Sequence, residues 1–257
     1  MSSLPARKAL LFSAGGARLA MRVSHLREVV AVSPDEGEVR AHGEAIATAF
    51  VSTVLGLSAG PSPYALLTEG SPAAALRVDA LHGIVDLADA EFFQLPARTV
   101  LPQPAPFSGA VVVRGEIALE LAVASLGFAP IEPAVEHVAA TADVDAPSER
   151  ELRFARGDRT FGVPLSILVQ VLENPRIAPV PLTPPSHRGL LYHGRALHPV
   201  LDIAVLYGDP PGGPVRTVLL LDAGGAGVGV IADRVLGVGE PRDAGLVRPS
   251  WDAVFAP

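Results

Sequence analysis

Hydrophobic and polar residues alternate in short runs along most of the chain, and glycines punctuate the runs. A side-chain period of two, bounded by glycine-containing turns, is typical of β-strands. The pattern therefore predicts many short strands joined by tight turns. The clearest predicted strands are residues 8–12, 19–23, 65–68, 74–78, 110–113, 117–121 and 218–221.

A few segments come closer to a helical pattern. Residues 23–30 and 166–172 carry apolar side chains at spacings of i, i+3 and i+6 or i+7, and residues 51–57 and 202–207 are further short helix candidates. Many strands with few helices predict a mainly β protein built from small barrels or sandwiches.

The chain repeats itself in three blocks that follow the same order. Residues 12–30 align with residues 154–172 at an offset of 142, and His42-Gly43-Glu44 corresponds to His193-Gly194-Arg195 at an offset of 151. A third block from Pro63 corresponds to one from Arg216, with Asp79 set against Asp233 at an offset near 154. Self-similarity of this kind indicates a tandem duplication.

The offset grows because the second copy gains a proline-rich stretch. Its four prolines within residues 176–189 have no donor N–H and a fixed φ, so we expect an extended surface arm there. Residues 129–149, between the copies, are acidic and rich in Ala and Pro, which predicts a linker.

Composition excludes several classes of function. The net charge of −7, with a single lysine, argues against a nucleic-acid partner. There is no cysteine, so disulfides, zinc-thiolate sites and thiol catalysis are excluded. No run of 18 apolar residues occurs, so we expect no direct membrane insertion and a cytoplasmic protein. No cofactor is predicted.

The motif order resembles the CheW-like domain of bacterial chemotaxis coupling proteins. The second copy carries Val169-Gln170-Val171, the loop APVPLTPPS, the stretch GLLYHGRALHPVLDI followed by LYG, and IADRVLGVGE. The first copy carries Arg27-Glu28-Val29-Val30, a degraded middle part, LRVDALHGIVDL, and SGAVVVRGEIALELAVASLGF, which looks like the family's last hairpin and short helix.

The resemblance implies a fold and a function. Each copy would be a pair of small five-stranded SH3-like β-barrels, and the protein would be a non-enzymatic adaptor. Its partners would be the regulatory domain of a sensor histidine kinase (CheA-like), the cytoplasmic tip of a chemoreceptor, or both. We predict a degenerate CheW-like domain at residues 6–128, the linker at 129–149, and a CheW-like domain lacking the final hairpin at 150–257. A third possibility is that the first copy is purely structural and packs against the second to replace the hairpin that it lacks.

The candidate partner-binding residues follow from this resemblance and from composition. The family's Glu and Arg, which pair across its receptor-facing side, become Glu28 with His42 in one copy and Gln170 with His193 in the other. Arg and Tyr are enriched at interface hot spots, which adds Arg195 and Tyr192. His198 completes the set of candidates.

A second hypothesis gives the same hairpin a metal-binding or hydrolytic role. A type II′ turn at Gly194-Arg195 would place His193, His198 and Asp202 on one face. Asp202 would be too far along the strand to complete a metal site or to orient His198 as a base, and Ser166 and Ser186 lack a nucleophile elbow. A solvated or partner-facing hairpin is therefore the preferred interpretation.

Three further features have structural explanations. The glycine-rich residues 223–229 are followed by a strand-like pattern, so we expect a turn and a strand and not a phosphate loop. Asp79 and Asp233 recur at the end of a strand, where a carboxylate accepts backbone N–H groups. Trp251 would either anchor the C-terminal tail onto a barrel or lie in an interface.

Overall fold

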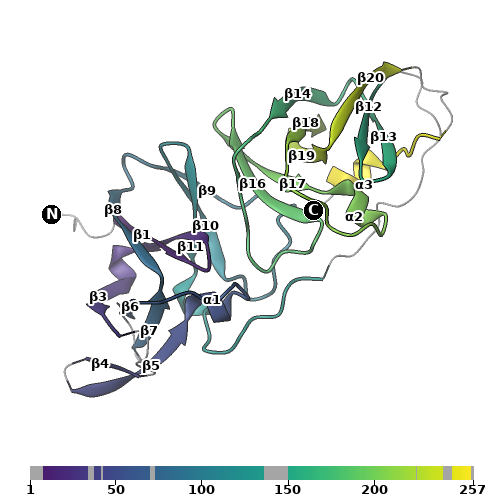
Figure 1. The fold of residues 1–257 in the computed structure, drawn as a ribbon. Coiled ribbons are helices and arrows are strands. Elements are labelled where there is room, and N and C mark those ends of the chain that lie inside the picture. Colours follow the sequence, from purple (N-terminus) through teal and green to yellow (C-terminus); the bar gives the residue numbers. More distant parts are fainter. Residues whose placement is uncertain are drawn as a thin grey trace. The chain divides into compact units, whose positions relative to one another are not determined.

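The computed structural model describes residues 8–33, 38–41, 43–69, 73–135, 150–223, 225–239 and 245–255 (Figure 1). It is mainly β with few short helices, which confirms the predicted fold class. The chain divides into two compact units. The first comprises Met1–Leu95, Leu101–Ala134 and Val180–Thr183, and the second comprises Pro96–Val100, Val135–Pro179 and Pro184–Pro257.

The first unit contains two sheets. The six-stranded sheet has the order β8-β1-β2-β11-β10-β9, and the five-stranded sheet has the order β3-β6-β7-β5-β4. The strands are β1 (Lys8–Ala14), β2 (Ala17–Arg22), β3 (Leu26–Ala31), β4 (Val39–Ala41), β5 (Glu44–Phe50), β6 (Tyr64–Thr68), β7 (Ala74–Val78), β8 (Ala80–Asp86), β9 (Glu91–Phe93), β10 (Phe107–Val113) and β11 (Glu116–Leu121). The helices are α1 (Val51–Val54) and the 3₁₀ turns Val23–His25 and Val123–Ser125.

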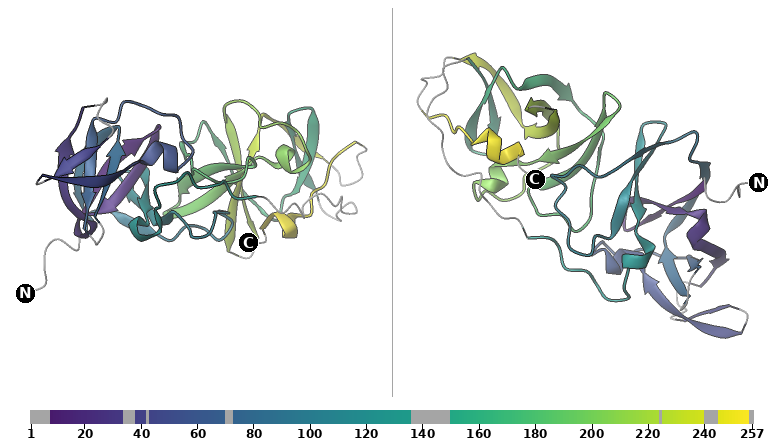
Figure 2. Two further views of the ribbon diagram at one scale, coloured as in Figure 1. Left: turned by 90° about the horizontal axis from the view of Figure 1, so that it is seen from below. Right: turned by 180° about the vertical axis from the view of Figure 1, so that it is seen from behind.

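The second unit also contains two sheets, and Figure 2 shows its strands curling around their own interior. The three-stranded sheet has the order β13-β12-β20, and the six-stranded sheet has the order β14-β18-β19-β17-β16-β15. The strands are β12 (Glu151–Arg156), β13 (Arg159–Pro164), β14 (Leu168–Glu173), β15 (Ile177–Ala178), β16 (His187–His193), β17 (Ala196–Leu201), β18 (Thr217–Ala223), β19 (Ala226–Ala232) and β20 (Arg234–Gly239). The helices are α2 (Ile203–Leu206) and α3 (Trp251–Phe255).

The strand layout of the two units repeats, as the sequence duplication predicts. β1 pairs with β2 and β8 in the first unit, just as β12 pairs with β13 and β20 in the second. The parallel pair β5 and β7 corresponds to the parallel pair β17 and β19. The third block therefore aligns with an offset of 154 along β8 and β20, because Ser13 pairs with Ala80 and Ala155 pairs with Arg234.

The main core of the second unit lies between its two sheets and α3. Phe154 and Phe161 stack at 5.5 Å between ring centroids, and both are fully buried. Val254 of α3 joins the same cluster, and the partly buried Trp251 packs against it. The alternation that predicted strands thus corresponds to one buried face per strand.

Two of the helix predictions are wrong. Residues 23–30 form a 3₁₀ turn followed by β3, and residues 166–172 lead into β14. Leu26 and Val30 are four positions apart, a spacing that places both side chains on one face in a helix and in a strand alike. Pairing with β6 and β18 decides for the strand. The helix candidates 51–57 and 202–207 are confirmed by α1 and α2.

The expected surface arm in the proline-rich stretch is also wrong. Val180 and Leu182 are buried, and only the two residues of β15 form a strand before β16 begins at His187. Proline's lack of an N–H does not prevent burial where apolar neighbours pack beside it. Of the predicted linker, residues 136–149 lie outside the described residues.

The two units cover the same strand edge with different elements. In the first unit β11 runs parallel to β2 and pairs Leu119 with Leu19. In the second unit Phe161 of β13, which aligns with Leu19, forms an isolated parallel bridge with Val247. We call residues 246–255 the C-terminal strap. It belongs to the second unit and covers this edge from within that unit.

Candidate functional site

The β16–β17 hairpin presents the histidine-rich stretch singled out in the sequence. His193 pairs with Ala196, as predicted. The turn itself differs from the prediction, because Gly194 has φ 59° and Arg195 has φ 60°. Positive φ at both central residues defines a type I′ turn, whose twist matches that of the flanking strands, whereas a type II′ turn has it only at the first. Arg195 lies exposed at the tip and Tyr192 is half-buried.

His193 contacts Gln170, the residue that the family resemblance pairs with it. The His193 Nε2 atom lies 3.0 Å from Gln170 Oε1. β14 and β16 are separated by three strands in the sheet order, so this contact requires the sheet to curl until its two ends approach. This contact joins the hairpin to β14. We use the name hairpin face for the candidate residues of this region: Gln170, Tyr192, His193, Arg195 and His198.

His198 supports the hairpin from its half-buried side. Its Nε2 lies 3.2 Å from the carbonyl oxygen of His193, which can only accept, so Nε2 carries the proton. Its Nδ1 is buried and has no hydrogen-bond partner among the described residues. The ring lies so close to Gly227 of β19 that a Cβ there would collide with it. His198 thus positions the turn instead of facing solvent.

Only one residue of the corresponding pair in the first unit is described by the structure. Glu28 lies exposed on β3, at the position equivalent to Gln170. Its expected partner, His42, lies outside the described residues.

Asp202 does not share the hairpin face, which corrects the sequence-based expectation. It follows β17, is fully buried, and accepts hydrogen bonds from two arginines. Arg156 Nε donates to Oδ1 at 2.9 Å and its Nη2 donates to Oδ2, while Arg188 Nη1 donates to Oδ2 at 3.0 Å. Asp202 therefore cannot orient His193 or His198 as a base.

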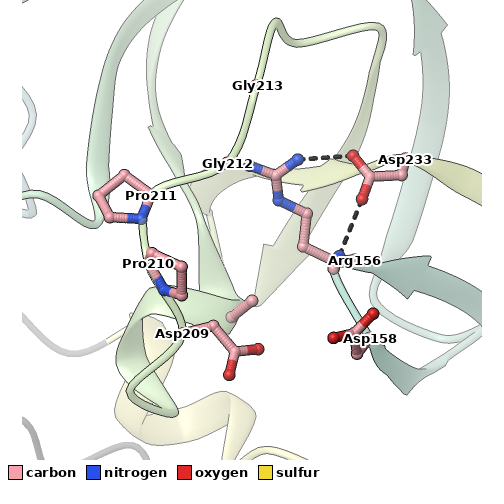
Figure 3. A pocket seen from close by; sticks show the side chains of 10 residues that line it. Arg156, Asp158, Asp209, Pro210, Pro211, Gly212, Gly213 and Asp233 are labelled. Atoms are coloured by element: carbon pink, nitrogen blue, oxygen red, sulfur yellow. Dashed lines mark hydrogen bonds and ion pairs between the residues drawn. The ribbon is translucent and has the colours of Figure 1, made fainter.

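Arg156 links Asp202 to a second carboxylate, Asp233 (Figure 3). Arg156 Nη1 donates to Asp233 Oδ1 at 2.5 Å, and the backbone N–H of Gly157 donates to Asp233 Oδ2 at 2.8 Å. The hydrogen bonds to Asp202 raise the pKa of Arg156 further above its ordinary value, so the guanidinium stays charged. Asp79 plays the same backbone-accepting part in the first unit, 2.7 Å from the Gly15 nitrogen. The predicted role of both aspartates is confirmed.

A pocket of about 330 Å³ opens beside this network. Figure 3 shows Asp158, Asp209, Pro210 and Pro211 around it, with Gly212 near the Arg156 side chain. Asp209 is itself paired with Arg159, 2.9 Å from its Nε. Asp209 and Asp233 are thus each paired with an arginine, and no Ser, Thr, Lys or His side chain is among the described residues that line the pocket. The network joins strands and stabilises the fold. In the sequence, only the recurrence of Asp233 at the position of Asp79 pointed to it.

The described residues contain no group of three His, Asp or Glu side chains able to hold a metal ion. His193 and His198 instead contact an amide oxygen and a backbone carbonyl oxygen. Because imidazole ligands for metal need free lone pairs directed at one point, this geometry favours the hairpin as a recognition element.

Part of the chain matches a known protein family. Residues 151–250 match the model of the CheW-like domain family. The matched segment comprises β12 to β20 and the first part of the C-terminal strap. Among solved structures, the chain is similar to the crystal structure of scaffolding protein TtCheW from Thermoanaerobacter tengcongensis, with 21% identity, a TM-score of 0.34, and coverage of 38% of this chain and 68% of that one. A search of the curated proteins found no match.

The matched segment, residues 151–250, carries the hairpin face, the Arg156 network and the first half of the C-terminal strap. The match ends at residue 250, so α3 lies beyond it, although Val254 of that helix is fully buried in the same core. CheW-like domains are non-catalytic scaffold modules of chemotaxis systems, which supports a scaffold or adaptor role for this chain. No helix among the described residues is long and apolar enough to cross a membrane.

Proposed function

We propose that this protein is a non-enzymatic adaptor of a bacterial chemosensory-type signalling system, acting in the cytoplasm. Its CheW-like domain binds the regulatory domain of a sensor histidine kinase, the cytoplasmic tip of a chemoreceptor, or both. The family match over residues 151–250 carries this proposal.

The hairpin face is the proposed contact surface. A type I′ turn fixes the backbone at its tip, so the exposed Arg195 is presented from a rigid base. The Gln170–His193 contact joins β14 to the hairpin, and His198 holds the turn from below. Preorganised arginine and aromatic side chains are the usual anchors of protein interfaces, since little conformational entropy is lost when they bind.

β14 also exposes two apolar side chains, next to Gln170 in the chain. Val169 is 59% exposed and Val171 is 38% exposed, on either side of Gln170. Burying them beneath a partner would add hydrophobic stabilisation next to the polar contacts. Such a surface favours binding and offers no group positioned for turnover.

The test is a pull-down with the full chain immobilised and a lysate of the source cells, quantified by mass spectrometry for histidine kinases and chemoreceptors. We expect enrichment of at least one of these two classes, and a loss of about tenfold with Arg195→Ala, as expected for a hot-spot arginine. Recovery of neither class would contradict the adaptor function.

Arg114→Ala is a matched control. Arg114 is exposed in the β10–β11 turn of the first unit and has φ 52°, close to the 60° of Arg195, so alanine meets the same backbone strain there. It should leave recovery unchanged. An equal loss with both variants would show that the hairpin face is not the contact surface.

A further inference from the structure

The C-terminal strap is held to β13 through a short stretch of backbone. The N–H of Val247 donates to Thr160 O at 2.8 Å, and the N–H of Gly162 donates to Val247 O at 3.0 Å. Trp251 Nε1 then donates to Gly162 O at 3.2 Å. These three hydrogen bonds use backbone groups at the free edge of β13 that would otherwise have no partner in the sheet. Pro164, at the end of β13, has no N–H and needs no acceptor.

The strap occupies the position that a full strand takes in the first unit. There, β11 lies parallel to β2 and is itself paired along its length with β10, which pairs with β9. Among the described residues the strap has a single bridge and no second strand behind it. The equivalent strand edge is thus covered in both units, by the β10–β11 hairpin in the first and by the short strap in the second.

The charges at the two edges are reversed. In the first unit Glu120, the residue after Leu119, lies 2.5 Å from Arg22 of β2. In the strap Arg248, the residue after Val247, lies 3.1 Å from Glu151 of β12, whose side chain is 1% exposed. An acidic residue at the Arg248 position would meet this buried carboxylate, and like charges in a desolvated site repel strongly.

We propose that the C-terminal strap is an exchangeable cover, and that the β13 edge beneath it accepts a parallel strand from a protein partner. The partner strand carries an apolar residue followed directly by a basic one, in the places of Val247 and Arg248. In the structure the strap fills this edge, so it acts as an autoinhibitory contact. Loss of the strap without a replacement would expose the Phe154–Phe161 core, so release is coupled to strand addition.

The test uses the full chain with Trp251→Ala and Val254→Ala, which loosen the strap, and a fluorescent peptide of residues 245–257 as the probe. We expect the peptide to bind this variant at least tenfold more tightly than it binds the unchanged protein. A peptide with Arg248→Glu should bind at least tenfold more weakly. Equal binding of both peptides, or no binding to a folded variant, would overturn the proposal.

Two controls keep this test decisive. Val235→Ala with Val238→Ala removes two exposed apolar side chains from β20 in the same unit and should leave peptide binding at the level of the unchanged protein. If the loosened variant does not fold alone, added peptide should restore its cooperative unfolding transition. Failure of the peptide to restore it would assign the strap a purely structural role.

Discussion

Both units bury an arginine near the strand that leads into their short helix, but they accommodate its charge differently. In the second unit Arg156 is paired with the fully buried Asp202. In the first unit Arg77, also fully buried, donates to the carbonyl oxygens of Ser62 and Ser33, and its guanidinium lies 5.1 Å from the ring centroid of Phe50.

Phe50 and Asp202 occupy equivalent positions, as the parallel pairs Phe50–Arg77 and Leu201–Val230 show. The position equivalent to Arg77 is Ile231, and the one equivalent to Arg156 is Ala14. The two buried arginines therefore lie on non-equivalent strands and have different partners. The comparison teaches that a buried guanidinium needs partners that replace its lost hydration. A carboxylate can do this, and so can backbone carbonyl oxygens together with the face of an aromatic ring.

The largest expected effect comes from Asp202→Ala. It leaves Arg156 buried without its main partner and removes a partner of Arg188, so the free energy of unfolding should fall by about 3–5 kcal/mol. Phe50→Ala in the first unit should cost only about 1–2 kcal/mol, since Phe50 is 36% exposed. Urea unfolding of the full chain measures both. Similar losses in the two variants would contradict the distinction between the two environments.

Acid should destabilise the second unit before the first. Burial, with Arg98 nearby, lowers the pKa of His187 to about 4, and both ring nitrogens lack hydrogen-bond partners among the described residues. Above pH 6.5 His187 is neutral in both states. Below that pH the unfolded chain takes up the proton and the folded one does not, so stability falls down to about pH 4, by at most about 3 kcal/mol.

Scanning calorimetry between pH 7 and 4 checks this prediction. The lower-temperature transition should shift with pH and should belong to the second unit. His187→Leu should remove most of the shift, whereas His82→Leu, at an exposed position on β8 of the first unit, should preserve it. A pH dependence that is the same in the two variants would refute the assignment to His187.

A smaller effect than that of Asp202→Ala is expected from Gly227→Ala. The added Cβ would collide with the His198 ring, so the variant should lose about 1–3 kcal/mol and the turn at Arg195 should shift. The first unit has Ala73 at the equivalent position, beside Ile46 where the second has His198. Restoring that combination with His198→Ile should recover part of the stability in thermal unfolding. A Gly227→Ala variant of unchanged stability would show that the ring is not held there.

Much of the candidate site could be predicted from the sequence. The register His193–Ala196 followed from the position of Gly194-Arg195, because a two-residue loop fixes a hairpin's pairing. The Gln170–His193 contact followed from the family resemblance. The position of Asp202 did not, because alternation along a strand stops where the chain turns into α2.

The contacts of the C-terminal strap could not be predicted from the sequence. The sequence left open whether Trp251 is an anchor or an interface residue, because its acceptor, Gly162, is 89 residues away and carries no sequence signal. The false helices at residues 23–30 and 166–172 have the same origin, since a four-residue apolar spacing is shared by both periods and only pairing across the sheet distinguishes them.

The sequence by itself determined the mainly β class, the duplication and the tight turns, because these depend on local alternation, on self-similarity and on residues that tolerate particular φ angles. The tertiary structure alone decided that the sheet curls to bring Gln170 to His193, that Arg156 finds Asp202, and that the tail covers β13. These contacts join segments far apart in sequence, and they form only when burial of the shared core offsets the entropy of closing the loops between them.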